Sequence, residues 1–198
     1  DQTISGLTRK RGLFGSSSDV SASQMARELG QRSTLTAVDL SKIGPLNASL
    51  NQFAYLLQSA DQRVPASSRS YAQSFTNIFG SSVPASYIDL GNFLQLVQQQ
   101  AGSGSVSQAA GDVLSAIGKS IVAEKHGAGK PGATGIAIYF PNSDLYQSSL
   151  TGAASYTALA NRFATASLWD DFLGYHYTGQ KFAQSSTNAV VPSGSLIR

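Results

Sequence analysis

Histidines, acidic pairs and glycine-rich segments are the features of this 198-residue chain that could support chemistry. The chain has two histidines, His126 and His176, and no cysteine. A Ser-His-Asp triad needs a histidine beside a serine on a strained turn, and no G-x-S-x-G sequence occurs here. Two histidines cannot form a three-histidine zinc site, and neither has a second ligand four residues later. We therefore assign no catalytic residue and no metal ligand, and we interpret both histidines as surface or hydrogen-bonded residues.

Two glycine-containing segments resemble phosphate-binding loops in their letters alone. Glycines at 127, 129 and 132 match G-x-G-x-x-G, but Pro131 interrupts the motif and an apparent strand follows it. A dinucleotide site requires a helix N-terminus after these glycines. Residues 118–120, Gly-Lys-Ser, resemble the end of a phosphate loop, but Val113 occupies the position of its first glycine. The sequence therefore predicts no cofactor-binding residue.

The adjacent acids Asp170 and Asp171 are a further candidate pair. On a helix, neighbouring side chains point about 100° apart, so these two cannot jointly hold a substrate. We interpret them as charges that complement the dipole at the N-terminus of a short helix, in preference to metal ligands.

The composition indicates a folded protein with few charges. Hydrophobic residues make up 41% of the chain and charged residues 13%, with a net charge of +3. The one basic cluster, Arg9-Lys10-Arg11, lacks interleaved aromatic residues and is interpreted as a solvated loop, so no nucleic-acid partner is predicted. No apolar run approaches the roughly 20 residues of a membrane span. The Ser- and Gln-rich composition favours an extracellular, periplasmic or cell-surface location.

Hydrophobic spacing predicts strands separated by helices, which is typical of an α/β fold. The segment 34–40 is almost wholly apolar or Thr and is predicted to be a strand buried on both faces. Three convincing strands make a thin sheet, so we expect the sheet to continue in residues outside this chain. The other predicted elements are a helix at 23–30, helices at 45–59 and from Pro65 to Gly80, an extended segment at 87–90, helices around 93–97 and 109–117, strands at 121–125 and 135–140, a helix at 156–163 and a last one at 169–173.

Four segments together resemble the clostripain family of cysteine peptidases, in order and in spacing. They are TLTAVDLSKIGPL (34–46), SYIDLGNFL (86–94), GIAIYFPNSDLY (135–146) and FATASLWDDFLGYH (163–176). The resemblance implies part of a caspase-like sandwich, a central sheet flanked by helices, with a helical C-terminal extension. It divides the chain into a poorly matched, loop-rich lead (1–33), the caspase-like portion (34–183) and a polar tail (184–198). It also implies sheet-core roles for Leu35, Val38, Ile136, Ile138 and Phe140, and packing roles for Trp169 and Phe172.

The resemblance further implies an endopeptidase that cleaves after Arg or Lys with a His-Cys dyad. In that family both dyad residues precede the matched region, so no catalytic residue is carried over to this chain. The first hypothesis is that the chain is the C-terminal, non-catalytic portion of such a peptidase, with the N-terminal portion of the same peptidase as an associated partner and a protein or peptide as substrate. The second is a catalytically inactive secreted or surface module for binding or structure, which uses a Ser- and Gln-rich surface and tyrosines such as 146, 156, 175 and 177. A remaining alternative is a hydrolase that uses a serine and one of the two histidines. No cofactor is identifiable, and calcium enters only through the family resemblance.

Overall fold

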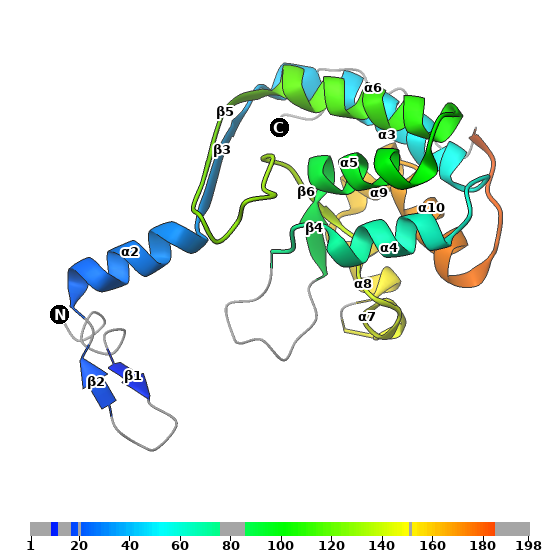
Figure 1. Ribbon diagram of the computed structural model, residues 1–198. Helices are drawn as coiled ribbons and strands as arrows, with labels where there is room; N and C mark the ends of the chain where they lie inside the picture. The colour runs from blue at the N-terminus through cyan, green and yellow to red at the C-terminus, as the bar shows by residue number, and fades with distance from the viewer. Residues whose placement is uncertain (1–8, 12–16, 20, 76–85, 151, 185–198) are drawn as a thin grey trace.

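The chain has an α/β fold in which the described residues form a helical body and three two-stranded antiparallel pairs. The computed structural model describes residues 9–11, 17–19, 21–75, 86–150 and 152–184. Figure 1 shows a compact group of helices on one side, from which a two-stranded ribbon leads away to an N-terminal helix and hairpin. The predicted α/β class is confirmed, whereas the caspase-like sandwich stays a prediction.

Five helices form the body: α3 (Ile43–Leu57), α4 (Arg63–Tyr71), α5 (Leu90–Ala101), α6 (Ser105–Ser120) and α10 (Trp169–Thr178). In α3, Leu46, Leu50, Phe53 and Leu57 recur at helical spacing, and all four are buried. A repeat of three to four residues places such side chains on one face of a helix. The helix predicted at 45–59 is therefore confirmed, as are those that correspond to α5, α6 and α10.

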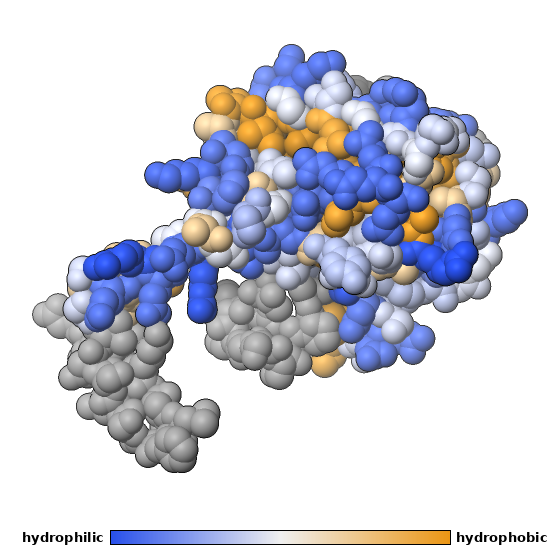
Figure 2. All heavy atoms as spheres, in the orientation of Figure 1, coloured by the Kyte–Doolittle hydropathy of each residue, from blue (hydrophilic) through white to orange (hydrophobic). Residues whose placement is uncertain are grey.

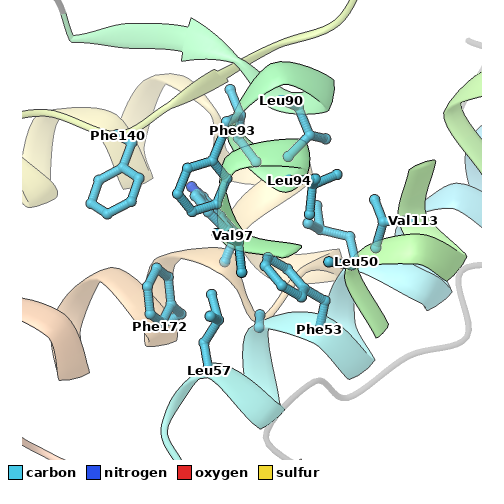
Figure 3. Packing of buried hydrophobic residues seen from close by; sticks show 14 of the residues in the cluster. Leu50, Phe53, Leu57, Leu90, Phe93, Leu94, Val97, Val113, Phe140 and Phe172 are labelled. Carbon is cyan, nitrogen blue, oxygen red and sulfur yellow. The ribbon is translucent and has the colours of Figure 1, made fainter. Parts of the chain in front are cut away.

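The core lies between these helices and is rich in aromatic rings. Phe93 of α5 is fully buried and makes edge-to-face contacts with Phe53, Phe140 and Trp169, at centroid distances of 6.3, 5.6 and 6.1 Å. Aromatic pairs favour this geometry because the positive ring edge meets the negative ring face. Figure 3 shows Phe93 and Phe140 beside the aliphatic residues of α3 and α5.

The helix predicted from Pro65 to Gly80 is wrong in its extent. Helix α4 ends at Tyr71, and Ala72 has an extended backbone with ψ of 146°. Ser74 then forms an isolated antiparallel bridge with Ile88, so this stretch lies alongside a strand. Tyr71 of the predicted apolar stripe is 78% exposed. The remainder of that stripe, Ile78 and Phe79, lies outside the described residues.

The body contains one pair of strands, β4 (Tyr87–Asp89) and β6 (Ala137–Tyr139), which are antiparallel with Ile88 opposite Ile138. Ile138 and Phe140 are buried, and Trp169 and Phe172 are fully buried beneath the pair. The packing roles expected for these four residues are confirmed. Ile136 is only half-buried.

Asp89 joins this strand pair to the helix that follows it. Its fully buried carboxylate accepts hydrogen bonds from the Asn92 N–H at 2.9 Å and the Thr134 N–H at 2.7 Å. The first bond caps the N-terminus of α5. A buried charge with several donors avoids most of the cost of losing water, so Asp89 fixes the turn between β4 and α5 against the segment that enters β6.

The second pair, β3 (Thr34–Val38) and β5 (Ile121–His126), forms an antiparallel ribbon with a bulge between Ala37 and Val38. The prediction that 34–40 is buried on both faces is wrong. Leu35 is 76% exposed and Val38 only half-buried, so Leu35 has no sheet-core role. The physical reason is that, among the described strands, β3 pairs only with β5. One face of this ribbon is therefore exposed, and it carries Leu35, Ala37, Ala123 and Lys125. Figure 2 shows hydrophobic residues on the surface where the ribbon joins the body.

The N-terminal region contains more regular structure than predicted. Strand β1 (Arg9–Arg11) pairs with β2 (Ser17–Asp19), so the basic cluster lies in a strand rather than in a loop. Helix α2 (Ala22–Arg32) begins at Ser21, which forms a capping box with Gln24. This confirms the helix predicted at 23–30 and extends it.

The C-terminal region adds three short helices, α7 (Ser143–Gln147), α8 (Ala153–Leu159) and α9 (Asn161–Ala166). The single helix predicted at 156–163 is interrupted at Ala160, whose φ and ψ of −100° and 29° lie outside the helical region. Among the described residues, no helix is both long and apolar enough to cross a membrane.

Candidate docking groove

A large open cavity of about 1060 Å³ lies between the ribbon end, the start of α3, strand β6 and the pair α8–α9. We call this cavity the groove. Its wall is largely apolar. Leu40, Ile43 and Leu46 line one side, and Tyr156 and Phe163 line the opposite side. Its volume is at the upper end of what small-ligand sites have, and its walls come from segments more than 100 residues apart in the sequence.

One side of the groove is the edge of strand β6. Gly135, Ile136 and Ala137 line the cavity, and Ala137 is exposed. In the described part of the chain, β4 is the only strand that pairs with β6. An unpaired strand edge presents backbone donors and acceptors to whatever approaches it.

Three tyrosines form an aromatic wall next to this edge. The Tyr139 ring stacks on the Tyr156 ring at 4.2 Å between centroids, and Tyr87 meets Tyr139 edge-on at 5.5 Å. Burial raises the pKa of Tyr139 to about 12 and raises that of Tyr156 further. Both phenols therefore stay neutral at physiological pH.

Two asparagines join helix α3 to helix α9 and the residues that follow it, at the side of the groove. Asn47 Nδ2 donates to the Ala166 carbonyl at 2.6 Å, and Asn51 Oδ1 accepts from the Leu168 N–H at 2.9 Å. The Asn47 Oδ1 atom is buried and has no hydrogen-bond partner within the described structure. Since an unpaired buried acceptor is costly, a donor supplied from the groove would be favourable there.

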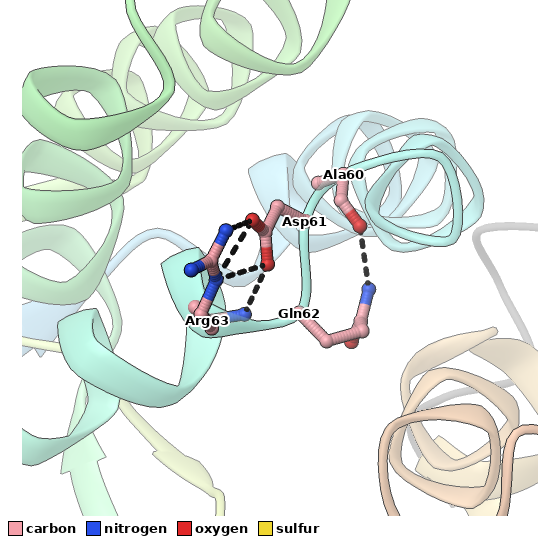
Figure 4. Close-up of polar contacts among 4 residues, drawn as sticks. All are labelled: Ala60, Asp61, Gln62 and Arg63. Carbon is pink, nitrogen blue, oxygen red and sulfur yellow. Dashed lines mark hydrogen bonds and ion pairs between the residues drawn. The ribbon is translucent and has the colours of Figure 1, made fainter.

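His176, the first of the two histidine candidates, is a packing residue below β6. Its Nδ1 lies 2.8 Å from Gln62 Oε1, and its ring meets the Phe140 ring at 5.3 Å. Burial, with a smaller effect from the Arg69 charge, lowers the pKa of His176 to about 4, so it is neutral at pH 7. Gln62 is itself held in the α3–α4 turn, where its Nε2 donates to the Ala60 carbonyl at 3.1 Å (Figure 4).

That turn also contains an exposed ion pair. Arg63 Nε lies 2.9 Å from Asp61 Oδ2, and the Arg63 backbone N–H donates to Asp61 Oδ1 at 3.0 Å. Hydrogen bonds from Arg63 lower the pKa of Asp61 to about 2. The pair closes the turn locally, next to Gln62 in the sequence (Figure 4).

His126, the second candidate, lies at the exposed end of the ribbon. Its Nδ1 is 3.0 Å from both carboxylate oxygens of Glu124 on the same strand. Within the described residues, neither histidine contacts a serine hydroxyl, and no three His, Cys, Asp or Glu side chains form a group that could hold a metal ion. The structure thus brings no catalytic triad together from the residues that the sequence singled out.

The glycines of the G-x-G-x-x-G match serve close packing. The N–H groups of Gly127 and Gly129 donate to the carbonyls of Ser33 and Gln31, at 3.0 and 2.8 Å. A Cβ atom on Gly127 would collide with the backbone of Gly30 and Gln31. The segment is followed by strand β6, and residues 118–120 form the last turn of α6. Neither segment precedes a helix N-terminus that could bind phosphate.

Asp170 and Asp171 occupy the first turn of α10, as predicted. Burial, followed by repulsion from Asp171, nevertheless raises the pKa of Asp170 to about 6. Its Oδ1 atom is buried without a hydrogen-bond partner among the described residues. Burial therefore outweighs the helix dipole at Asp170, which the sequence interpretation did not anticipate.

No protein-family model, curated protein or solved structure matches the chain. The groove is thus defined by its own geometry. The residues that line the groove lie far apart in the sequence, so no local sequence pattern could have revealed the groove. The nearest signal in the sequence is the small number of predicted strands, which make a thin sheet for this many helices.

Proposed function

We propose that this chain is the non-catalytic, C-terminal portion of a clostripain-like cysteine endopeptidase that cleaves after Arg or Lys. On this proposal the His-Cys dyad belongs to an N-terminal portion of the same peptidase, which associates with this chain through the groove. The complete assembly would be a caspase-like sandwich at the cell surface, in the periplasm or outside the cell.

The observation that carries the proposal is the convergence of the four clostripain-like segments on one cavity. Segment 34–46 contributes Leu40, segment 86–94 contributes Leu90, segment 135–146 contributes Ala137 and segment 163–176 contributes Phe163. Residues that share a role at an interface need to meet in space, whatever their separation in sequence. Their convergence supports a common purpose for the four segments.

The chemistry of the groove supports a protein partner rather than a reactive site. A cysteine dyad needs a thiolate beside an imidazole, and the chain has no cysteine. The described groove lining has Arg162 as its one charged residue. A large apolar hollow with a free strand edge is typical of a surface that another polypeptide covers.

The alternative of an inactive binding module rests on a Ser- and Gln-rich surface and on four tyrosines, and the structure uses these tyrosines internally. Tyr156 is buried against Tyr139, and Tyr146 stacks on Tyr177 at 4.3 Å. The Tyr175 hydroxyl donates to the Gln58 carbonyl at 2.9 Å. These rings stabilise the fold, so they give the alternative no support.

The proposal is tested by combining this chain with the N-terminal portion of the peptidase and following hydrolysis of an arginyl amide. Leu40 lines the groove and is 65% exposed, so Leu40→Asp places a charge in the groove with little effect on folding. We expect it to weaken association at least tenfold, because the added carboxylate would lose water on docking.

The matched control is Val122→Asp, since Val122 is 72% exposed on the ribbon and does not line the groove. It should associate like the unmodified chain. Equal effects of the two substitutions, or none from Leu40→Asp, would contradict docking through the groove.

A further inference from the structure

The hydrogen-bond pattern of β6 shows which backbone groups face its free edge. The Leu90 N–H donates to the Ile136 carbonyl, and the Phe140 N–H donates to the Ser86 carbonyl, each at 2.8 Å. Along a strand of an antiparallel pair, the backbone N–H and C=O of one residue bond the partner strand, and those of the next residue point away from it. Ile138 therefore bonds to Ile88 of β4, and Ile136 and Phe140 bond to the residues that flank β4, Leu90 and Ser86. The N–H and C=O of Ala137 and Tyr139 point away from β4.

Three of the other outward-facing backbone groups of this strand pair have partners within the described residues. On the far edge of β4, the Asp89 N–H donates to the Gln73 carbonyl at 2.7 Å, and Tyr87 accepts from the Phe75 N–H at 3.0 Å. On the edge of β6, the Tyr139 carbonyl accepts from Trp169 Nε1 at 2.7 Å. Ala137 remains: it is exposed, it lines the groove, and its two outward groups bond nothing in the described structure.

From this edge we infer that the groove receives a β-strand, which pairs with β6 through two hydrogen bonds at Ala137. The identity of the occupant rests on the proposed function: it is a strand of the dyad-bearing N-terminal portion. In an antiparallel pair, two residues opposite each other exchange two N–H···O=C bonds. The N–H and C=O of Ala137 can therefore bond one residue of an added strand, as in β-strand addition.

The groove lining determines the side chains that such a strand can carry. Tyr156 and Phe163 on one side and Leu40 and Ile43 on the other are apolar. Arg162 is the single charge among the described lining residues. The incoming strand must therefore present apolar, uncharged side chains at the positions that it buries, because a charge there would have no partner.

Amide hydrogen exchange at Ala137 tests the inference on the unmodified chain. Alone, the chain should exchange the Ala137 N–H rapidly and the Ile138 N–H, which bonds to β4, slowly. Addition of the N-terminal portion should slow exchange at Ala137 at least tenfold. Association that leaves the Ala137 rate unchanged would overturn the inference. Slow exchange at Ala137 in the chain alone would also overturn it, and slowing that grows with chain concentration would identify a second copy as the occupant instead.

A substitution pair gives a second, independent test. Ala137→Pro removes only the outward N–H, since proline suits an edge strand and the bonds of Ile136 and Ile138 to β4 remain. It should weaken association about tenfold or more, because the carbonyl of the added strand is left without a donor. Ala137→Ser retains the N–H at similar size and should bind within threefold of the unmodified chain. Equal weakening by both substitutions contradicts the pairing.

The two proposals can fail separately. Protection of Ala137 without any hydrolysis of the arginyl amide would count against the peptidase and leave the strand pairing intact. Hydrolysis by the combined portions, with no protection of Ala137 and no effect of proline, would retain the peptidase and remove the strand pairing.

Discussion

His176 and Asp170, both in α10, have opposite effects on how the free energy of unfolding changes between pH 4 and 6. Burial lowers the pKa of His176 to about 4, so protonation in this range favours the unfolded chain. Burial raises the pKa of Asp170 to about 6, so protonation in the same range favours the folded chain. The two contributions therefore oppose each other, and the unmodified chain should show a shallow pH dependence of stability there.

Single substitutions should separate these contributions. In Asp170→Asn the histidine acts alone, so the free energy of unfolding should increase as the pH rises from about 4 to 6.5. In His176→Gln the aspartate acts alone, so that free energy should decrease as the pH rises from about 4 to 6. Urea unfolding at a series of pH values measures both slopes, and slopes of the same sign in the two variants would contradict the assignment.

Asp170→Asn should also stabilise the chain at pH 7. The substitution removes a partly buried charge that has an oxygen without a partner. Because Asp170 is still partly exposed to solvent, which screens its charge, we expect the free energy of unfolding to rise by roughly 1 kcal/mol. Asp171→Asn, on the adjacent helical position, is the control for loss of charge near the helix N-terminus, where an acid is favourable. It should give no comparable gain.

Trp169 combines core packing with the hydrogen bond that covers the Tyr139 carbonyl. Trp169→Phe removes the donor and leaves a small cavity, so it should destabilise the chain by about 2–3 kcal/mol. Tyr71→Phe, at a ring that is 78% exposed, should change stability by less than about 0.5 kcal/mol. Thermal and urea unfolding measure both, and a Trp169→Phe change as small as that of the control would show that the bond and the packing contribute little.

At the scale of elements, the contact of the 127–129 loop with α2 depends on the absence of a side chain at Gly127. Gly127→Ala places a Cβ against the backbone of Gly30 and Gln31 and should break the bond from Gly127 N–H to Ser33. Gly30→Ala lies in α2 with open space around its Cβ and should stabilise that helix by up to about 1 kcal/mol. Amide exchange in α2 should be faster in the first variant and slower in the second. No change in α2 for Gly127→Ala would contradict the close packing.

The sequence predicted helices better than strand environments, for reasons that particular residues show. Leu46, Leu50 and Phe53 repeat with a helical period that only a one-sided helix satisfies, and α3 is where it was expected. The run at 34–40 has no such period, so an apolar strand could not be distinguished from an exposed ribbon. The interruption at Ala160 has no glycine or proline to signal it.

At the scale of the whole molecule, the candidate site was beyond sequence reasoning because it exists only where distant segments meet. Leu40 and Ala137 line the same groove although they are far apart in the sequence, and Asn47 and Asn51 of α3 hold α9 beside it by donating to the Ala166 carbonyl. The sequence did indicate an incomplete sheet, and the free edge of β6 is consistent with that indication. What it could not supply was the position of that edge relative to the apolar walls.

The most direct test of the account is an amidase assay with selective alkylation of thiols. This chain, which has no cysteine, should hydrolyse no arginyl amide alone, and prior treatment with iodoacetamide should leave its ability to complement the N-terminal portion unchanged. The same treatment of the N-terminal portion should abolish the combined activity. Hydrolysis by this chain alone, or combined activity that survives alkylation of the N-terminal portion, would contradict the central claim that the reactive thiol comes from the partner.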